Sequence, residues 1–375
     1  MSSAHPVCHQ ASAPAARACL LLALLLGAAC AAPARGPASS GPAAGGAAAA
    51  NDPSGQMAAG ASAAVQTPAS FRVRLAYAEP AAALSALWVA QDAGFFARHG
   101  LDVDMSYVQS AQTVPAVIGG DMDVAFGGGY AAMSSRLAGS DLTIFYGLVT
   151  WYPYELMAIP SVQSPADLRG QKIGISRFGS SSDVATRLAL RHLGLDPEQD
   201  VTYVQIGSLP ERVAAMQAGA LAAGLAGVPD NLRLRKLGFK SLLDLASMGD
   251  ESMINMGYAG AGWIQTNESH VQDLVDALVE GVHYAKTNRE FTERLIAQYV
   301  KLEDPEDIAY AYDHDVVNIL PRVGRPSVEE GRKYLASQEA TDPRAVGAQA
   351  AEFFDLRFTD HVLSSGLVER LYGKE

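Results

Sequence analysis

Residues 172–196 read KIGISRFGSSSDVATRLALRHLGLD, and this stretch decides the fold. Residues 172–176 are a short apolar run typical of a buried strand, and residues 177–182 form a loop rich in Ser and Gly. Residues 183–193 carry apolar side chains at helical spacing, and a glycine ends that helix. Because another apolar run follows at 201–206, the sequence predicts a strand, a helix and a strand in succession.

The same plan also occurs earlier in the chain. Residues 72–77 look like a strand, an apolar-periodic helix follows and ends at a glycine, and a second strand is expected at 103–108. The two copies also share a short identical sequence, since residues 100–102 and 194–196 both read GLD. The shared order of elements and the matching turn glycines indicate a repeated unit.

Each copy continues with a short helix, a glycine-containing turn and a buried strand, at 114–127 and at 213–227. Each half therefore reads β-α-β-α-β. This order predicts an α/β protein with two lobes, each a mostly parallel sheet flanked by helices. From about residue 264 onward the pattern is mainly helical, and we expect this tail to pack back on the first lobe.

The patterns divide the chain into four parts, joined in the folded body by two crossing segments. Those segments are expected near 150–152 and near 258–260, where they act as a hinge. The parts are a signal peptide at 1–30, a tether at 31–69, a first lobe at 70–150 plus 260–375, and a second lobe at 151–259.

The composition of the chain excludes several classes of function. The chain has 375 residues, enough for two domains, and 28 Lys and Arg against 40 Asp and Glu give a formal net charge of −12. No basic run stands out, so no nucleic-acid role is expected. All three cysteines, Cys8, Cys19 and Cys30, precede the folded body. That body therefore holds no disulfide framework, no cysteine-ligated zinc site and no thiol nucleophile.

The N-terminal segment predicts export. A short apolar run at 20–26 follows Arg17 and precedes small residues. It is too short to span a membrane, which takes about 20 apolar residues, and it is typical of a secretory signal. Two alternatives stay open for its end, which are lipidation of Cys30 at the outer face of the cell membrane and cleavage after Ala31. Residues 31–69 are mostly Ala, Gly, Pro and Ser, a composition expected of a disordered tether.

Ligands of open parallel sheets bind outside the carboxyl ends of the strands, and this rule selects the loops after the expected strands. Glycines at 127–129 let backbone N–H groups approach a ligand. The loop at 176–182 combines hydroxyls, the free amides of a helix N-terminus and Arg177, which suits an anionic oxygen group. The candidate ligand-binding residues are Glu79, Pro80, Gln109, Ser110, Gly128, Tyr130, Trp151, Ser176, Arg177, Gly179, Ser180, Ser181, Asp230 and Trp263.

These residue types also have simpler interpretations. A serine before Asp183 is an ordinary helix N-cap, and Asp183 itself would repel an anion. The aromatic residues of the region can line a ligand or pack in the core and hinge. They are Trp151, Tyr152, Tyr154 and Trp263. No pattern in the sequence predicts a metal site or a catalytic residue.

Three motifs resemble those of a known family. They read AQDAGFF at 90–96 with GLDV at 100–103, GGDMDVA at 119–125, and LRGQKIG at 168–174. Together they resemble the substrate-binding proteins of ABC transporters of the nitrate/sulfonate/taurine type, whose relatives bind thiamine-pyrimidine precursors. The resemblance covers 71–263.

The resemblance implies a hinged periplasmic-binding-protein fold of type II, an ABC permease and an ATPase as partners, a small-molecule solute, and no cofactor or catalysis. A sulfonate, nitrate, carboxylate or related small organic anion is the favoured ligand. A neutral aromatic, a pyrimidine or vitamin precursor, or a tethered sensor without a transporter are the alternatives. A thiamine-pyrimidine synthase is not expected, because the cysteine-rich iron-binding motif of those enzymes is absent. We expect a monomer held at the membrane by an N-terminal lipid anchor.

Overall fold

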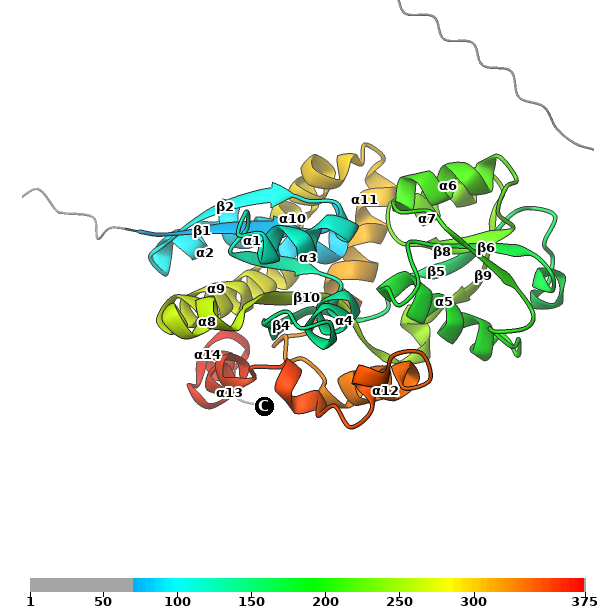
Figure 1. Ribbon diagram of the computed structural model, residues 1–375. Helices are drawn as coiled ribbons and strands as arrows, with labels where there is room; N and C mark the ends of the chain where they lie inside the picture. Colours follow the sequence, from blue (N-terminus) through cyan, green and yellow to red (C-terminus); the bar gives the residue numbers. More distant parts are fainter. Residues whose placement is uncertain (1–69, 374–375) are drawn as a thin grey trace, which may run out of the picture. The chain divides into compact units, whose positions relative to one another are not determined.

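The computed structural model of the chain describes residues 70–373, which belong to one compact unit, Val65–Glu375. The expected signal peptide at 1–30, the tether at 31–69 and the lipidation site at Cys30 lie outside the described residues. Within residues 70–373 the chain builds two five-stranded sheets, each flanked by helices (Figure 1). The elements of the second sheet, drawn in green, form one group in that view.

In the first sheet four strands run in one direction, and the fifth runs antiparallel to them. Strand β1 pairs in parallel with β2 and with β3, and β10 runs antiparallel to both β3 and β4. In spatial order its strands are β2 (Leu101–Tyr107), β1 (Phe71–Tyr77), β3 (Val124–Gly127), β10 (Glu251–Gly260) and β4 (Leu142–Trp151).

The second sheet repeats this topology. Strand β6 pairs in parallel with β7 and with β8, and β5 runs antiparallel to both β8 and β9. In spatial order its strands are β7 (Thr202–Gln205), β6 (Lys172–Ile175), β8 (Ala223–Ala226), β5 (Glu155–Ala158) and β9 (Lys240–Asp244). The matching strand orders confirm the predicted pair of α/β lobes, each a mostly parallel sheet.

Residue type explains which strands lie at the centre. Strands β3 and β8 are buried at every position, which is typical of strands covered by helices on both faces. At the edge of the first sheet, β2 alternates between the buried Leu101 and Val103 and the exposed Asp102 and Asp104. The centre of each sheet therefore lies in the core, and its carboxyl edge is left to the loops.

Helices connect the strands in both lobes. In the first lobe they are η1 (Ala82–Leu84), α1 (Ser85–Asp92), α2 (Phe95–Arg98), α3 (Ser110–Ile118) and α4 (Gly129–Leu137). In the second lobe they are η2 (Pro165–Leu168), α5 (Ser181–His192), α6 (Leu209–Gln217), α7 (Asp230–Lys236) and η3 (Leu245–Met248). Some begin at a clear signal in the sequence, such as the capping box at α6 in which the Ser208 hydroxyl accepts a hydrogen bond from the Glu211 N–H.

The C-terminal tail is helical and packs on the first lobe, as predicted. Helix α9 lies against α1 so closely that a Cβ at Gly281 would come within 2.9 Å of the Ala86 carbonyl oxygen. The tail comprises α8 (Ala261–Thr266), α9 (Glu268–Thr287), α10 (Arg289–Ile296), η4 (Ala297–Lys301), α11 (Pro305–Ala311), η5 (Tyr312–Ile319), α12 (Val328–Gln338), η6 (Pro343–Ala345), η7 (Ala350–Phe353), α13 (Arg357–Ser364) and α14 (Leu367–Tyr372). Among residues 70–373, no helix has the length and apolar character needed to cross a membrane.

One expected boundary needs correction. We assigned 151–259 to the second lobe, but β10 (Glu251–Gly260) pairs with β3 and β4 in the first sheet. The return crossing between sheets therefore lies before Glu251 and not near 258–260. The first crossing, at 152–154 between β4 and β5, lies beside its expected position.

Candidate functional site

The loops after the parallel strands of the two lobes meet each other. A Cβ placed on Gly128, just after β3, would lie 3.1 Å from the Ser181 hydroxyl oxygen at the start of α5. A Cβ on Gly179 would lie 3.9 Å from the Tyr334 hydroxyl of α12. We call this contact region the inter-lobe site. Its basic end consists of Thr113, Gly127, Gly128, Tyr258, Arg177 and Ser181, and its acidic end of Glu79, Tyr154, Arg212, Asp230 and Asp315.

The first lobe contributes a closely packed surface to the basic end. We call it the glycine bed, and it consists of Thr113, Gly127 and Tyr258. The Tyr258 hydroxyl of β10 donates to Thr113 Oγ1 of α3 at 2.8 Å. A Cβ at Gly127 would come within 2.9 Å of Thr113 Oγ1 and 3.1 Å of the Tyr258 hydroxyl, so a glycine is required there. Burial raises the pKa of Tyr258, while the bond to Thr113 and the nearby Arg177 act against that rise.

Two polar groups of the second lobe face this bed without partners. Arg177 is half-buried, and among residues 70–373 its guanidinium forms no ion pair or side-chain hydrogen bond. It lies near enough to Tyr258 and Tyr334 to act on the pKa of both hydroxyls. The Ser181 hydroxyl is buried and likewise has no hydrogen-bond partner among the described residues. A cation and a hydroxyl are thus available to a bound group.

The other polar groups of the 176–182 loop form hydrogen bonds within the loop and with Asp183. Ser180 Oγ caps α5 by accepting from the Asp183 N–H at 3.3 Å and donates to the Arg177 carbonyl at 2.7 Å. Ser176 Oγ donates to Ser180 Oγ at 2.8 Å. The Gly179 N–H donates to the Asp183 carboxylate at 2.8 Å. Ser176, Gly179 and Ser180 therefore build the loop, whereas Arg177 and Ser181 present free polar groups.

The acidic end begins with Glu79, which follows β1. Burial raises the pKa of Glu79 to about 7, opposed by Arg212 and reinforced by Asp315 and Asp230. No side-chain hydrogen bond of Glu79 occurs within the described residues. Asp230, at the start of α7, is 8% exposed, and burial raises its pKa although Arg233 lies 3.2 Å away.

Arg212 is the main residue that the sequence did not identify. It lies on α6 and is 7% exposed, and its Nη1 donates to the Ile206 carbonyl at 3.0 Å. Its Nε is buried without a partner in residues 70–373. Burial lowers the pKa of Arg212, and Tyr154 and Glu79 are the neighbours that most oppose this. Residues 208–213 read SLPERV, a pattern typical of a helix start, but nothing in this pattern indicates that Arg212 turns inward.

Asp315, on η5, also lay outside the predicted site. It is 1% exposed, its Oδ1 lies 2.6 Å from His314 Nδ1, and it accepts a bond from the Ala83 N–H. Burial raises its pKa. Tyr154, in the first crossing, was one candidate for an aromatic wall, and burial followed by the charge of Glu79 raises its pKa.

Four other candidates lie near the inter-lobe site without forming either end. Pro80, Gln109 and Ser110 are exposed beside the carboxyl ends of β1 and β2. Trp151, at the end of β4, is 36% exposed and would be 3.8 Å from a Cβ at Gly249.

Tyr130 is a core residue of the first lobe. Its hydroxyl lies 2.9 Å from the Tyr152 hydroxyl and donates to Glu330 at 2.9 Å. The Met253 N–H also points to it at 3.4 Å. With three partners inside the protein and no exposed surface, this hydroxyl has no free position for a ligand.

Trp263 does not belong to the site, which corrects the sequence prediction. It lies on α8 after β10, and its ring is 6.5 Å from Phe71 at the start of β1. Because β10 is antiparallel to β3, its carboxyl end lies at the amino edge of the parallel strands. Trp263 therefore packs at the edge opposite the inter-lobe site.

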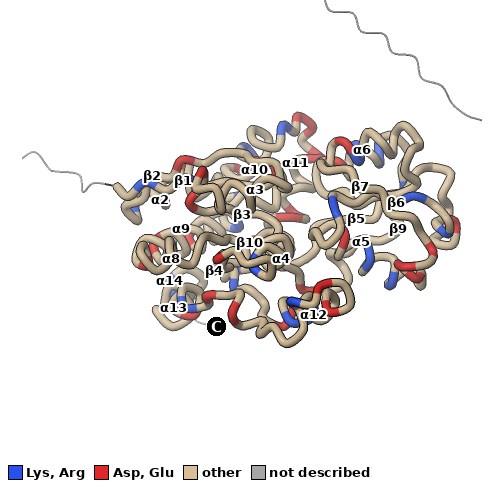
Figure 2. Tube along the Cα trace, in the orientation of Figure 1, with Lys and Arg blue, Asp and Glu red and all other residues tan. Residues whose placement is uncertain are grey.

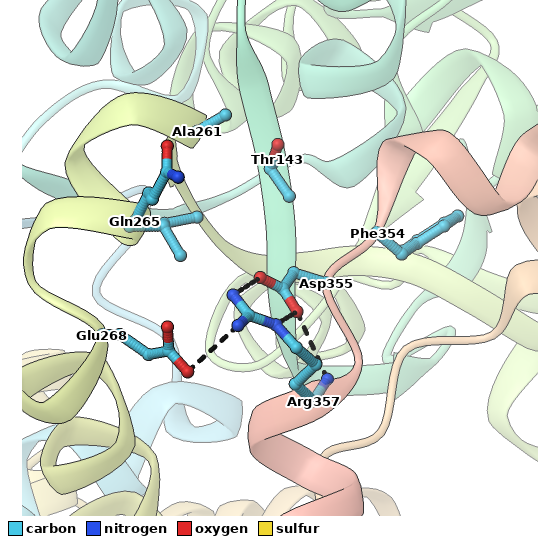
Figure 3. Close-up of a pocket in the computed structure, with 8 residues that line it drawn as sticks. Thr143, Ala261, Gln265, Glu268, Phe354, Asp355 and Arg357 are labelled. Carbon is cyan, nitrogen blue, oxygen red and sulfur yellow. Dashed lines mark hydrogen bonds and ion pairs between the residues drawn. The ribbon is translucent and has the colours of Figure 1, made fainter.

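Two surface hollows lie at that opposite edge as well. They have volumes of about 370 and 600 Å³ and share Glu268 and Arg357. Arg357 lies between Asp355 and Glu268 and binds both carboxylates (Figure 3). The Arg357 guanidinium is thus paired within the protein, and the parallel strands present their amino ends at this edge. We therefore place the candidate site between the lobes and not in these hollows.

Figure 2 shows Lys and Arg interspersed with Asp and Glu along the described trace. Within residues 70–373, no group of three His, Cys, Asp or Glu side chains is placed to hold a metal ion.

Comparison with known proteins places the fold. The profile of the family described as NMT1/THI5 like matches residues 82–290. The alkanesulfonate-binding protein SsuA from Xanthomonas axonopodis pv. citri, bound to MOPS, superposes with a TM-score of 0.60 at 19% identity, covering 76% of this chain and 96% of its own. The periplasmic nitrate-binding protein NrtA from Synechocystis PCC 6803 gives 0.66 at 15% identity, covering 81% and 90%.

A third structure, the periplasmic aliphatic sulphonate-binding protein SsuA from Escherichia coli, gives a TM-score of 0.60 at 19% identity, covering 75% of this chain and 91% of its own. No curated protein matches the sequence. The expected periplasmic-binding-protein fold is confirmed by these structures, while their identities are too low to transfer a ligand.

Proposed function

Because the chain belongs to the NMT1/THI5-like family, we propose that it is the extracytoplasmic solute-binding component of an ABC importer. It captures a small organic molecule with an anionic group between its two lobes and delivers it to a membrane permease and its ATPase. The alternative of a neutral aromatic ligand is not favoured by the inter-lobe site, whose basic end offers an unpaired charge. The alternative of a tethered sensor would use the same site without a transporter.

One observation carries the proposal. Arg177 is a half-buried guanidinium with no partner among residues 70–373, and it faces Tyr258 and the glycine bed of the opposite lobe. Leaving a charge unpaired in such a place is unfavourable unless a partner arrives. A carboxylate, sulfonate or nitrate oxygen is the partner that a guanidinium binds best, and the free Ser181 hydroxyl adds a donor.

The mechanism follows from where the contacts lie. The basic end takes Gly127, Thr113 and Tyr258 from the first lobe and Arg177 and Ser181 from the second. A ligand held by one lobe gains the second set of contacts only when the lobes close. Ligand binding therefore shifts the chain toward the closed form, which is the form that a permease recognises.

Calorimetric titration of residues 70–375 with ethanesulfonate, nitrate and propanoate tests this function. We expect Arg177→Ala to weaken binding of the anion that titrates by about 1.5–3 kcal/mol, the value of a hydrogen bond to a charged group. Arg191→Ala is the matched control, because Arg191 is exposed on the same α5. Equal affinities of wild type and Arg177→Ala would remove Arg177 from the site. Failure of wild type to bind any of the three anions would refute the anion-binding function.

Export and anchoring are part of the proposal. The apolar run at 20–26 and the small residues that follow support secretion, and a tether from Cys30 would let the lobes reach a permease. The mass of the mature N-terminus in membrane and soluble fractions decides between lipidation of Cys30 and cleavage after Ala31. A full-length N-terminus in the cytosol would contradict export.

The proposal assigns no catalysis. Some relatives of this fold make the thiamine pyrimidine with a cysteine-rich iron-binding motif, and this chain has no cysteine after Cys30. The protein is proposed to act as a monomer.

A further inference from the structure

We infer that the hydroxyl group of Tyr130 is the pivot of lobe closure, because it fastens the first-lobe ends of both crossings to α12. This inference rests on the proposed function and adds a positioning residue to it. Tyr130 has no exposed surface, so it acts on a ligand only through the position of other residues.

The two crossings between the lobes run side by side. On the first-lobe side, Glu251 of β10 pairs with Trp151 of β4. On the second-lobe side, the Leu245 N–H donates to the Tyr154 carbonyl at 3.0 Å. Movement of one lobe against the other must therefore be taken up by the few residues between these two links.

The Tyr130 hydroxyl of α4 holds the first-lobe end of each crossing. It lies 2.9 Å from the Tyr152 hydroxyl, at the start of the first crossing, and 3.4 Å from the backbone nitrogen of Met253, just after the return crossing. It donates to Glu330 Oε1 of α12 at 2.9 Å. Because a hydroxyl has one proton and two acceptor positions, Tyr130 must accept from Tyr152 and from the Met253 N–H. One oxygen thus joins both crossings to α12.

Helix α12 is a fixed part of the first lobe, because the chain on both sides of it hydrogen-bonds to the edge strand β4. Before the helix, the Gly147 N–H donates to the Gly324 carbonyl at 2.7 Å. After the helix, the Asp355 N–H donates to the Ile144 carbonyl at 2.8 Å. The helix is therefore expected to stay with the first lobe when the second lobe moves.

The same helix also lies against the second lobe. The Tyr334 hydroxyl, one turn beyond Glu330, is 3.9 Å from the Cβ position of Gly179. At the start of the helix, the Ser327 hydroxyl donates to Glu251 at 2.6 Å, where the return crossing enters β10. The bond between tyrosine and glutamate in the first turn of α12 therefore sets how the crossings lie relative to the surface that the second lobe meets.

Burial makes these hydrogen bonds decisive for the position of the crossings. Tyr130, Tyr152 and Glu330 are 0%, 1% and 8% exposed. A buried polar group left without a partner is more unfavourable than the net gain from one hydrogen bond is favourable. The crossings therefore keep one position relative to α12 while all three bonds are present.

The test removes the hydroxyl and keeps the ring. In the structure the loops of the two lobes contact each other, so looser crossings favour more open arrangements. We expect small-angle scattering of ligand-free residues 70–375 to give a larger radius of gyration for Tyr130→Phe than for wild type. Calorimetric titration with ethanesulfonate, nitrate and propanoate should show, for the anion that binds best, a Kd about two- to tenfold higher, the equilibrium equivalent of one net hydrogen bond.

Two further variants grade the effect. Tyr152→Phe removes one bond and leaves the bond between Tyr130 and Glu330, so it should change the radius and the Kd in the same direction by less. Glu330→Gln keeps an acceptor oxygen for the Tyr130 proton, and it should stay close to wild type in both measurements.

Tyr312→Phe is the matched control, because Tyr312 is 3% exposed and its hydroxyl donates to the Lys286 carbonyl at 2.9 Å within the C-terminal tail. It should lose stability in urea but keep the wild-type radius and Kd. A Tyr130→Phe protein with the radius and Kd of the Tyr312→Phe protein would overturn the inference, since its hydroxyl would then be only structural. If none of the three anions binds wild type, the proposed function fails, and the scattering comparison still decides whether the hydroxyl controls the lobes.

Discussion

At the residue scale, the inter-lobe site depends on polar groups left incomplete by their own lobe. Arg177 and Ser181 lack partners at one end, and Glu79 lacks one at the other. Most of the 176–182 loop does the opposite, since Ser180 and Asp183 satisfy its hydroxyls and amides. The unpaired groups are therefore better indicators of ligand contact than the loop composition.

The sequence led to some of these residues and not to others. Glu79, Arg177 and Ser181 follow strands directly, so the rule on carboxyl ends found them. Arg212 lies one helical turn further along, where the direction of a side chain depends on helix packing. Trp263 was selected for its residue type alone, and the antiparallel β10 carries it to the opposite edge.

The first prediction concerns the pH dependence of folding. The pKa of Glu79 is about 7 in the folded chain against an ordinary value of 4.5. Between these values the folded state keeps a proton that the unfolded state has released. The stability from this group is therefore full below pH 4.5 and is lost as the pH rises through about 7. We expect that loss to be on the order of 1–3 kcal/mol.

Urea unfolding of wild type and Glu79→Gln at a series of pH values measures this loss. The difference in unfolding free energy, wild type minus variant, should fall across the pH window, because the other titrating groups are common to both proteins. A difference that stays constant with pH would show that Glu79 titrates alike in both states.

At the element scale, short repeated motifs predicted the helices and strands well. Apolar runs marked the buried β3 and β8, and glycines and capping serines marked the helix ends. Strand β10 shows the limit of this approach. Its apolar run follows the second lobe in sequence, but it inserts between β3 and β4 of the first sheet. Local pattern fixes that a strand forms, while its pairing is decided by long-range contacts.

The packing of α9 on α1 gives the second prediction. Alanine is normally favoured over glycine within a helix by about 1 kcal/mol. A Cβ at Gly281 would nevertheless lie 2.9 Å from the Ala86 carbonyl oxygen and 3.1 Å from Ala90 Cβ. The two helices would have to separate, so Gly281→Ala should lower the unfolding free energy by about 1–3 kcal/mol.

Gly262→Ala on the exposed part of α8 is the control for that measurement, because nothing lies within 4 Å of its Cβ position. Chemical denaturation should show it unchanged or stabilised by up to about 1 kcal/mol. A Gly281→Ala protein as stable as the Gly262→Ala protein would mean that α9 and α1 are not tightly packed.

At the scale of the whole molecule, the lobes are joined by more than the ligand site. Lys236 of α7, in the second lobe, binds Asp304 at 2.9 Å and Asp307 at 2.7 Å. These aspartates lie before and within α11, which belongs to the tail packed on the first lobe. Residues 303–307 read EDPED, which is typical of a helix start, but a local pattern cannot show that a lysine of the other lobe reaches it.

This ion-paired cluster gives the last prediction. If closure brings Lys236 to the two aspartates, the pairs favour the closed form and hence ligand binding. Lys236→Ala should raise the Kd for the best-bound anion about two- to fivefold, a modest effect because the cluster is exposed to solvent.

Lys172→Ala, which removes an exposed lysine of the same lobe without an ion pair in residues 70–373, should bind as wild type does. The gap between wild type and Lys236→Ala should narrow as salt is added, since salt screens exposed charges. An affinity loss that salt leaves unchanged would mean that Lys236 acts by packing, and no loss at low salt would mean that the cluster does not bias closure.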